Sequence, residues 1–286
     1  MASDCVIAID IGGTKIEVGL VAANGTIRAR QRAATNVEDP WSTLTELLGG
    51  IDASGAGSVG VGTGGPMTPA GETVSPLNIA GWRDFPLRQR LRDHTGLDVF
   101  IDNDAKALAL GEGRFGAARG VDNFIAMVVS TGVGGGIVLD GRLLHGRGAN
   151  AGHIGHVIVE PDGARCACGG RGCLEAEASG PSIAKRTGRP ASEADDATIE
   201  RTGTLVGRGI ASVVNLLDLQ LALVGGSVAL GMGDAFFAAA QRELDARSQI
   251  VFARGARVAP VGLGADGPLI GAAVVAFSAG DAGARR

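Results

Sequence analysis

Three cysteines and a histidine lie close together in the second half of the chain. Cys166, Cys168 and Cys173 fall within eight residues, and His156 precedes them by ten positions. Three thiolates and one imidazole fill the four positions of a tetrahedral zinc site, in which the metal organises a loop and performs no chemistry. The Cys-x-Cys pair is tighter than the usual Cys-x₂-Cys knuckle. We therefore predict a structural Zn²⁺ in the loop 156–173, unlike a standard zinc finger.

Two glycine-rich turns have the composition of phosphate-binding loops. The first, Asp10-Ile-Gly-Gly-Thr-Lys15, follows an apolar strand, and the second runs from Ser130 to Gly136. Glycines let backbone N–H groups approach a phosphate, and a carboxylate at a strand end can hold a hydrated Mg²⁺. Neither turn has the Walker A or Rossmann spacing. One interpretation is that the first turn is an ordinary hairpin turn. The other is that the two turns together bind a triphosphate from both sides.

Asp102, Asn103 and Asp104 join an apolar strand, Val99–Ile101, to a helix-forming stretch. One interpretation is that all three are capping residues for that helix. The other is that Asp104 projects into a cleft as a general base. A carboxylate at a helix N-terminus stays ionised because the helix dipole favours its charge, and it could accept the proton of a substrate hydroxyl.

Two carboxylates, Glu175 and Glu177, follow the last cysteine. A carboxylate fixed beside a metal loop can accept hydrogen bonds from sugar hydroxyls. The alternative is that both belong to a solvated charged face.

The elements that must position these residues follow a repeated plan. A strand around Val6–Ile9, a glycine-rich turn, a second strand and an Asn24-Gly25 turn recur about 120 residues later as Ile125–Val129, the second glycine-rich turn, Ile137–Leu139 and Asp140-Gly141. This recurrence predicts two lobes of related topology. Further predicted elements are helices at 41–48, 87–94, 104–113, after Gly233 and at 268–277, with a strand at 221–224. Strands that alternate with helices indicate an α/β fold.

Composition excludes several classes of protein. The chain has 286 residues, 45% hydrophobic and 20% charged, so it is long enough for one large domain or two smaller ones and is not disordered. A net charge of −4 gives no overall field that would attract nucleic acid. The N-terminus lacks the pattern of a signal peptide, no uninterrupted apolar run is long enough to span a membrane, and the cysteines do not form a disulfide framework. We therefore expect a cytoplasmic enzyme.

In this order and spacing, the motifs resemble those of the ROK family of sugar kinases (repressors, open reading frames, kinases) over nearly the whole chain. The matching pieces are Asp10–Lys15, Asn78…Gly81-Trp82…Pro86-Leu87, Asn103-Asp104-Ala105, Ser130–Gly136, Gly152-His-Ile-Gly-His156, Cys166-x-Cys-Gly-x-x-Gly-Cys173-Leu-Glu175 and Val224-Gly-Gly226. The resemblance implies the actin/hexokinase-type ATPase fold, with two RNase H-like α/β lobes around a central cleft. The implied boundaries are a small lobe at 1–118, a large lobe at 119–266 and a C-terminal helix at 267–286 that packs back on the small lobe.

The resemblance also implies the roles of single residues in ATP-dependent phosphorylation of a hexose at its 6-hydroxyl. Asp104 would be the general base. The implied sugar-contacting residues are Gly65, Asn103, Asp104, His153, His156 and Glu175. The implied ATP-binding residues are Asp10, Gly12, Gly13, Thr14, Lys15, Thr131, Gly132, Val133, Gly134, Gly135, Gly225 and Gly226. The zinc ligands would be His156, Cys166, Cys168 and Cys173, and the cofactors ATP, Mg²⁺ and structural Zn²⁺. Members of the family are commonly homodimers or homotetramers.

One departure concerns the sugar. Most family glucokinases have Glu-x-Gly-His where this chain has His153-Ile-Gly-His156. That Glu accepts hydrogen bonds from hydroxyls near the anomeric carbon, whereas an imidazole is bulkier and can donate or accept. A His at this position also resembles some N-acetylmannosamine kinases. Glucose is the first expectation, and N-acetylmannosamine or a related hexosamine is the alternative.

Two further classes of protein share this family resemblance. Repressors of the family carry an N-terminal helix-turn-helix, for which the nine residues before Asp10 leave no room, so we expect no nucleic-acid partner. A non-catalytic sugar sensor would be expected to lose Asp104 or a phosphate loop, and both are intact. The motifs do not choose between ATP and polyphosphate as phosphoryl donor.

Overall fold

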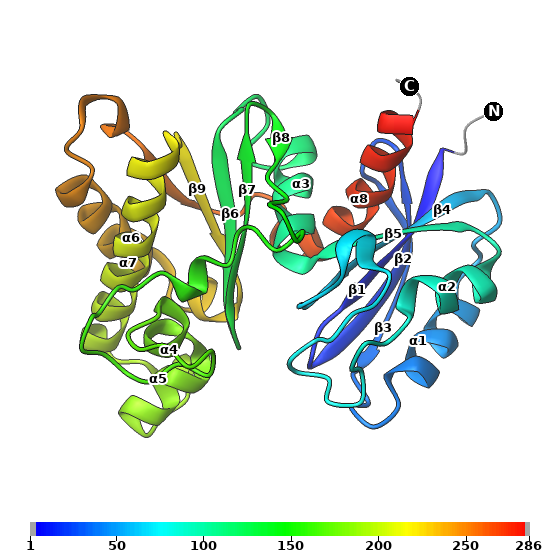
Figure 1. The fold of residues 1–286 in the computed structure, drawn as a ribbon, viewed down its shortest axis with the longest axis horizontal. Coiled ribbons are helices and arrows are strands. Elements are labelled where there is room, and N and C mark those ends of the chain that lie inside the picture. The colour runs from blue at the N-terminus through cyan, green and yellow to red at the C-terminus, as the bar shows by residue number, and fades with distance from the viewer. Residues whose placement is uncertain (1–3, 284–286) are drawn as a thin grey trace. The chain divides into compact units, whose positions relative to one another are not determined.

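The computed structural model describes residues 4–283, which form two compact units. The first unit contains the chain up to Gly116, the segment His145–Ala151 and the chain from Leu263 onward. The second contains Ala117–Leu144 and Gly152–Gly262. Each unit is built on its own five-stranded sheet (Figure 1).

The two sheets share one topology. Their strand orders are β3-β2-β1-β4-β5 and β8-β7-β6-β9-β10. In each sheet three strands form an antiparallel meander, and two further strands extend its first strand in parallel. The strands of the first sheet are β1 (Cys5–Ile11), β2 (Lys15–Ala22), β3 (Ile27–Ala34), β4 (Ala56–Thr63) and β5 (Asp98–Asn103). Those of the second are β6 (Phe124–Val129), β7 (Val133–Leu139), β8 (Arg142–Leu143), β9 (Leu221–Gly225) and β10 (Arg257–Pro260). The repeated plan predicted from the sequence is therefore present in both units as the hairpins β1–β2 and β6–β7.

Helices cover both faces of the first sheet, which explains why β1 is buried along its whole length. Side chains of a strand alternate between faces, so Ile7 and Ile9 pack with α1 and α2 while Val6 and Ala8 pack with α8. The helices of this unit are α1 (Pro40–Gly49), α2 (Leu87–Thr95), α3 (Asp104–Phe115) and α8 (Gly267–Gly283). The last three residues of the predicted C-terminal helix lie outside the described residues. Within 4–283, α8 packs on α3, β1 and β4.

Helices α4 to α7 enclose the core of the second unit. Ile125, Met127 and Val129 of β6 are fully buried against apolar side chains of α6 and α7, which also pack on each other. The helices are α4 (Leu174–Ala178), α5 (Gly180–Thr187), α6 (Asp196–Leu217) and α7 (Ser227–Arg247). Short 3₁₀ turns lie at Pro69–Gly71, Ile154–His156, Ala191–Glu193, Val251–Ala253 and Gly264–Asp266. Over residues 4–283, none of the helices combines the length and apolar character needed to cross a bilayer.

The structure corrects two predicted boundaries. The second glycine-rich turn is shorter than predicted, because β7 already begins at Val133 and its first glycines pair with β6. Helix α7 begins at Ser227 and not after Gly233, where a non-helical backbone (φ 65°, ψ −152°) only interrupts it. A glycine without a Cβ adopts such angles at low cost, so this one marks a break inside the helix and not its start.

Candidate active site and metal centre

The first glycine-rich turn closes the hairpin between β1 and β2. Gly12 N–H donates to the Lys15 carbonyl (2.9 Å). At Gly13 a Cβ would lie 2.5 Å from the Cβ of Asn78, so only glycine fits there. Thr14 is exposed at the tip of the turn. The predicted ATP-binding residues from Asp10 to Lys15 therefore lie in one tight turn, with its backbone close to the surface.

Asp10 is a buried carboxyl in an electrostatically unfavourable place. Only 7% of its surface is exposed. Burial raises the pKa of Asp10 to about 7, the negative charges of Asp104 and Glu17 add to this effect, and Lys15 opposes it. Lys15 is itself held by Glu17 (Nζ to Oε2, 2.7 Å).

Asp104 lies at the same edge of the first sheet. In the parallel register Asp10 pairs through β4 with Asp102, two residues before Asp104. Strand β5 runs to Asn103, whose side chain caps α3 by accepting from Ala105 N–H (3.1 Å). Of the three possible caps, Asn103 is therefore the N-cap. Asp104 is the first residue of α3 and is exposed.

Gly65 follows β4 at this edge, and a Cβ there would lie 3.9 Å from Nδ2 of Asn103. The first unit therefore brings four predicted site residues to the carboxyl ends of parallel strands: Asp10, Gly65, Asn103 and Asp104. Ligands of open α/β sheets bind at such edges.

Sequence reasoning missed Lys106, which is only 1% exposed. Its Nζ donates to the Ala149 carbonyl (2.8 Å) and lies 3.8 Å from Asp102 Oδ1. His145 Nδ1 lies 3.8 Å from the other oxygen of Asp102. Burial raises the pKa of Asp102, and the ammonium of Lys106 opposes that rise. The sequence feature that could have identified Lys106 is its position inside the otherwise apolar stretch 105–110.

In the second unit, two predicted nucleotide-binding segments lie together at the ends of the parallel strands β6 and β9. The hydroxyls of Ser130 and Ser227, which follow these strands in their respective turns, share a hydrogen bond (2.9 Å). Gly226 has φ of 95°, and a Cβ on it would lie 2.4 Å from the Val129 carbonyl. The turn 130–132 and Gly225-Gly226 therefore pack directly on one another, while Gly134 and Gly135 belong to β7.

Glu175 and Glu177, on the short helix α4, have different environments. Glu175 Oε2 accepts from Val133 N–H (2.9 Å), so this predicted sugar-contacting carboxylate lies against the second glycine-rich turn. Glu177 is 5% exposed, pairs with Arg201 (2.7 Å) and accepts from Ala164 N–H (2.6 Å). Of the two alternatives, a solvated charged face therefore does not apply to Glu177, whose carboxylate binds the backbone of the cysteine-containing loop at Ala164.

The four predicted metal ligands converge. The ligand atoms of His156, Cys166, Cys168 and Cys173 all lie within 4.8 Å of one another. The Cys168–Cys173 sulfur atoms are 3.7 Å apart, as are Cys166 Sγ and His156 Nδ1. A tetrahedral zinc with Zn–S bonds of about 2.3 Å separates its sulfur ligands by roughly 3.8 Å. Both the spacing and the chemistry of the donors therefore fit Zn²⁺.

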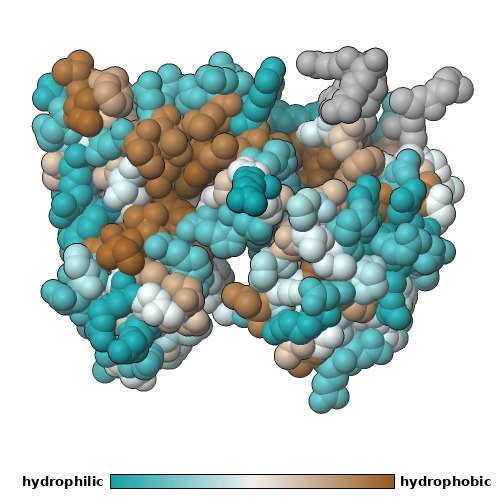
Figure 2. Space-filling model, in the orientation of Figure 1, coloured by the Kyte–Doolittle hydropathy of each residue, from teal (hydrophilic) through white to brown (hydrophobic). Residues whose placement is uncertain are grey.

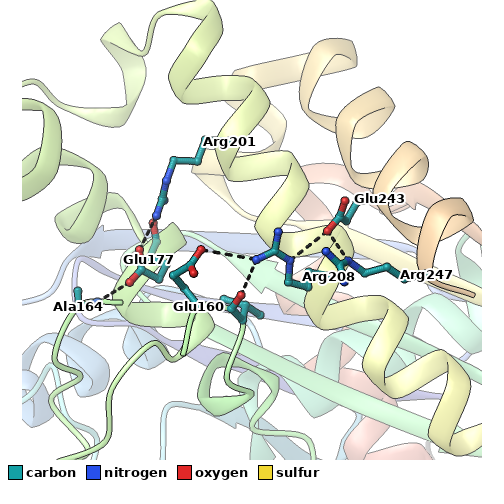
Figure 3. A network of polar contacts seen from close by, with 8 residues as sticks. Glu160, Ala164, Glu177, Arg201, Arg208, Glu243 and Arg247 are labelled. Carbon is teal, nitrogen blue, oxygen red and sulfur yellow. Dashed lines mark hydrogen bonds and ion pairs between the residues drawn. The ribbon is translucent and has the colours of Figure 1, made fainter. Parts of the chain in front are cut away.

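Arginines of α6 anchor the loop around this cluster (Figure 3). Arg201 binds Glu177, and Arg208 donates to the Val159 carbonyl (2.7 Å) while pairing with Glu243 (3.0 Å). His153 precedes the 3₁₀ turn that carries His156, and the two exposed rings are nearly parallel with centroids 6.2 Å apart.

Comparison with known proteins agrees with this geometry. The sequence profile of the ROK family matches residues 6–278. The chain belongs to the ROK family. It is 36% identical to an N-acetylmannosamine kinase of Pasteurella multocida over 79% of this chain and 82% of that protein. It is 32% identical to a glucokinase of Halalkalibacterium halodurans over 93% and 92%.

Solved structures give the same result. This ROK protein superposes on a ROK glucokinase from Streptomyces griseus, crystallised with glucose and AMPPNP, with a TM-score of 0.82. That comparison has 31% identity and covers 94% of this chain and 98% of the other. A ROK hexokinase from Thermus thermophilus gives a TM-score of 0.81 at 32% identity, covering 97% and 99%. The expected α/β fold of the actin/hexokinase type, with two units of related topology, is confirmed.

Proposed function

We propose that this ROK protein is an ATP-dependent hexose kinase that converts glucose to glucose 6-phosphate. The observation that carries the proposal is the placement of Asp104, an exposed carboxylate at the first turn of α3, beside Asn103 and on the same sheet edge as the phosphate turn at Asp10. Family membership and the glucokinases among its relatives support the same activity.

Asp104 would act as the general base. Its carboxylate takes the proton of the sugar 6-hydroxyl as that oxygen attacks the γ-phosphorus, and ADP leaves with the bridging oxygen. Asp104 lies in the first turn of α3, where the positive end of the helix dipole favours a negative charge. Gly65, Asn103, His153, His156 and Glu175 are the residues proposed to contact the sugar and to fix the 6-hydroxyl in line.

The two glycine-rich turns would hold the nucleotide. In the first, Gly12, Gly13, Thr14 and Lys15 offer N–H groups, a hydroxyl and an ammonium to the phosphates. In the second unit, the proposed contacts are Thr131, Gly132, Val133, Gly134, Gly135, Gly225 and Gly226. Asp10 would hold a hydrated Mg²⁺, because this cation prefers oxygen donors. The negative charges of Asp10 and Asp104 repel each other, and a cation bound there would relieve that repulsion. A Mg²⁺ held there would supply positive charge to offset that of the transferring phosphoryl group.

Zinc has a structural role in this proposal. His156, Cys166, Cys168 and Cys173 would hold it, with every position of the tetrahedron filled by protein. The loop 156–173 would then keep His156 in a fixed orientation, three residues after His153.

N-acetylmannosamine is the second candidate substrate, and His153 is the observation that favours it. The exposed imidazole occupies the position where family glucokinases carry Glu, and relatives such as the Pasteurella multocida protein are N-acetylmannosamine kinases. The acyl-hexosamine would place an N-acetyl group at C2, where an imidazole can donate or accept a hydrogen bond.

Coupled measurement of ADP release over glucose, N-acetylmannosamine, mannose, fructose and N-acetylglucosamine tests the proposal. We expect the highest kcat/KM for glucose. A higher value for N-acetylmannosamine would transfer the assignment to that sugar, and no turnover of any sugar would refute the kinase. Release of sugar phosphate with polyphosphate in place of ATP tests the donor.

The variant Asp104→Asn is the control for chemistry. Removal of a general base lowers kcat by roughly 10²–10⁴-fold. Calorimetry should show that the variant still binds the sugar, because the amide of Asn has nearly the same shape as the carboxylate of Asp. Near-full activity of this variant would place the base elsewhere.

The assembly proposed for this kinase is a homodimer or homotetramer in the cytoplasm. Apolar residues gather on the visible face of the second unit (Figure 2), and that unit exposes Leu216 (80%), Val251 (80%) and Phe252 (57%). Light scattering after size exclusion should give two or four times the 28.7 kDa chain mass; a monomer at all concentrations would contradict this part of the proposal.

A further inference from the structure

The chain passes between its two compact units at four points, after Gly116, Leu144, Ala151 and Gly262. As a result the first unit is assembled from three separate stretches of chain. Helix α3 belongs to the first stretch, and its last turn leads directly to the first passage at Gly116. The other two stretches are the segment His145–Ala151 and the chain that starts at Leu263.

Two charged side chains of α3 are almost completely buried, and each one binds a different stretch. The first is Lys106, which is 1% exposed and donates from Nζ to the Ala149 carbonyl at 2.8 Å. Its stem packs in the interior, and Asp102 lies 3.8 Å from the ammonium. Ala149 has a left-handed backbone (φ 58°), so its carbonyl is turned to a direction that an ordinary extended segment would not give.

The second is Glu112, with no exposed surface. Its Oε1 accepts from the N–H of Leu263 at 2.9 Å, which is the first residue after the last passage. Its other oxygen packs on Gly116, the last residue before the first passage: a Cβ at that glycine would lie 2.1 Å from Oε2. The carboxylate of Glu112 therefore contacts the chain both where it leaves the first unit, at Gly116, and where it finally returns, at Leu263.

Buried charges on one helix are costly unless each has a fixed partner. For each of these charges one hydrogen-bond partner is a backbone group of a returning stretch, so part of the offset depends on that stretch staying in place. The helix that carries them begins with Asp104, the proposed base. Lys106 lies two residues from it, and the segment that Lys106 holds leads directly to His153 and His156.

We propose that Lys106 and Glu112 are positioning residues that fix the passage points of the chain onto α3, Lys106 at the segment 145–151 and Glu112 at the stretch that begins with Leu263. Through the segment 145–151, Lys106 would also position the chain that leads to His153 and His156. The catalytic part of this inference rests on the proposed hexose kinase activity, and the anchoring part does not.

Hydrogen exchange with mass spectrometry on the full-length protein without ligands tests the anchors, using Lys106→Met and Glu112→Gln. Suitable reporter amides are Ala151, which donates to the His145 carbonyl, and Leu263 itself. Because the lost hydrogen bond is donated by a charged group, Lys106→Met should speed exchange in 145–151 by roughly 10–100-fold. Glu112→Gln keeps one carbonyl oxygen and should speed exchange at Leu263 several-fold.

Each variant is the control for the other. Lys106→Met should leave the Leu263 peptide within about twofold of wild type, and Glu112→Gln should do the same for 145–151. Lys185→Met, an exposed lysine on α5, controls for the loss of a lysine. If either variant speeds both regions equally, or neither region responds, the assignment is overturned. Should Lys106→Met fail to fold, Asp102→Asn provides a milder change at the same anchor, with acceleration expected in 145–151 alone.

Steady-state kinetics tests the catalytic part. Because the segment held by Lys106 leads to the proposed sugar-contacting histidines, Lys106→Met should raise the KM for sugar about tenfold and leave the KM for ATP within about twofold. Equal changes in both constants would indicate a general structural defect and overturn the role in sugar positioning. If wild type itself turns over no sugar, the proposed function fails, whereas the exchange experiment still decides the anchors.

Discussion

The buried carboxyl of Asp10 gives a quantitative prediction for the first unit. Its pKa of about 7 compares with 3.8 for an unperturbed Asp. Each pKa unit corresponds to about 1.4 kcal/mol, so ionised Asp10 destabilises the ligand-free protein by at most roughly 4 kcal/mol. Because Asp10 is only 7% exposed, solvent screens little of this effect.

The sign follows from proton binding. Between about pH 4 and pH 7 the folded protein holds a proton on Asp10 that the unfolded chain has lost. Stability rises with pH only where the unfolded state binds more protons, so this group makes stability fall as pH rises through that interval. The full penalty is present above pH 7 and absent below pH 4.

Urea unfolding followed by tryptophan fluorescence measures this penalty. Both tryptophans of the chain, Trp41 and Trp82, pack in the core of the first unit, so the signal reports on the unit that contains Asp10. The useful quantity is the stability of wild type minus that of Asp10→Asn, which cannot ionise. From about pH 4 to pH 8 this difference should fall by up to roughly 4 kcal/mol.

Two further variants separate the causes. In Asp104→Asn the fall should move to lower pH, because the charge that repels ionised Asp10 is gone. Asp93→Asn removes an exposed carboxylate of α2 and controls for the general loss of one negative charge. A difference between wild type and Asp10→Asn that stays constant from about pH 4 to pH 8 would refute the reasoning from burial.

Three other predictions concern the packing and the metal. Cys168→Ser should abolish stoichiometric zinc by plasma mass spectrometry and make the loop 156–173 sensitive to protease; a variant that retains one zinc per chain would refute the ligand assignment. Glu177→Gln should lower the free energy of unfolding by about 1–3 kcal/mol, as expected for the loss of a charged hydrogen bond. It should also weaken zinc retention against a chelator. Unchanged retention would show that this carboxylate does not support the loop. Gly60→Ala should lower the free energy of unfolding by roughly 1–3 kcal/mol, because the new Cβ would lie 2.0 Å from a backbone oxygen of α8. In the control Gly49→Ala, the new Cβ meets nothing within 4 Å, so this change should be neutral or slightly stabilising. Equal melting temperatures for the two variants would contradict the close packing of β4 on α8.

The features that could be predicted from the sequence depend on short stretches of chain. The recurrence of an apolar strand, a glycine-rich turn, a second strand and an Asx-Gly turn identified both hairpins. Asp140 and Gly141 do adopt positive φ (50° and 70°), as such a turn requires. The cysteine cluster was equally local, since Cys166, Cys168 and Cys173 lie on one loop. Where several neighbours competed for one role, as among the three candidate caps of α3, the sequence left the choice open. The parallel register of β5 decided it, because the strand extends to Asn103.

The features that could not be predicted depend on contacts between distant residues. Glu175 meets Val133 across 42 positions of sequence, and Lys106 meets Ala149 across 43. Such contacts follow from the packing of whole elements, and neither residue type nor spacing specifies them. For the same reason Glu177 could not be distinguished from a solvated carboxylate until Arg201 of α6 was placed beside it.

Buried charge nevertheless carries information that a sequence can supply in part. A lysine or glutamate within an apolar helical stretch must either reach solvent or find a fixed partner, because an unpaired buried charge costs several kcal/mol. In α3, Lys106 is in this position, and Glu112, six residues later on the helix that begins at Asp104, is equally buried. An apolar pair of similar volume could fill the same space without specifying which backbone groups lie against it. The charged pair specifies them, Ala149 and Leu263, and this is the physical reason to treat α3 as the element that fixes where the chain enters and leaves the first unit.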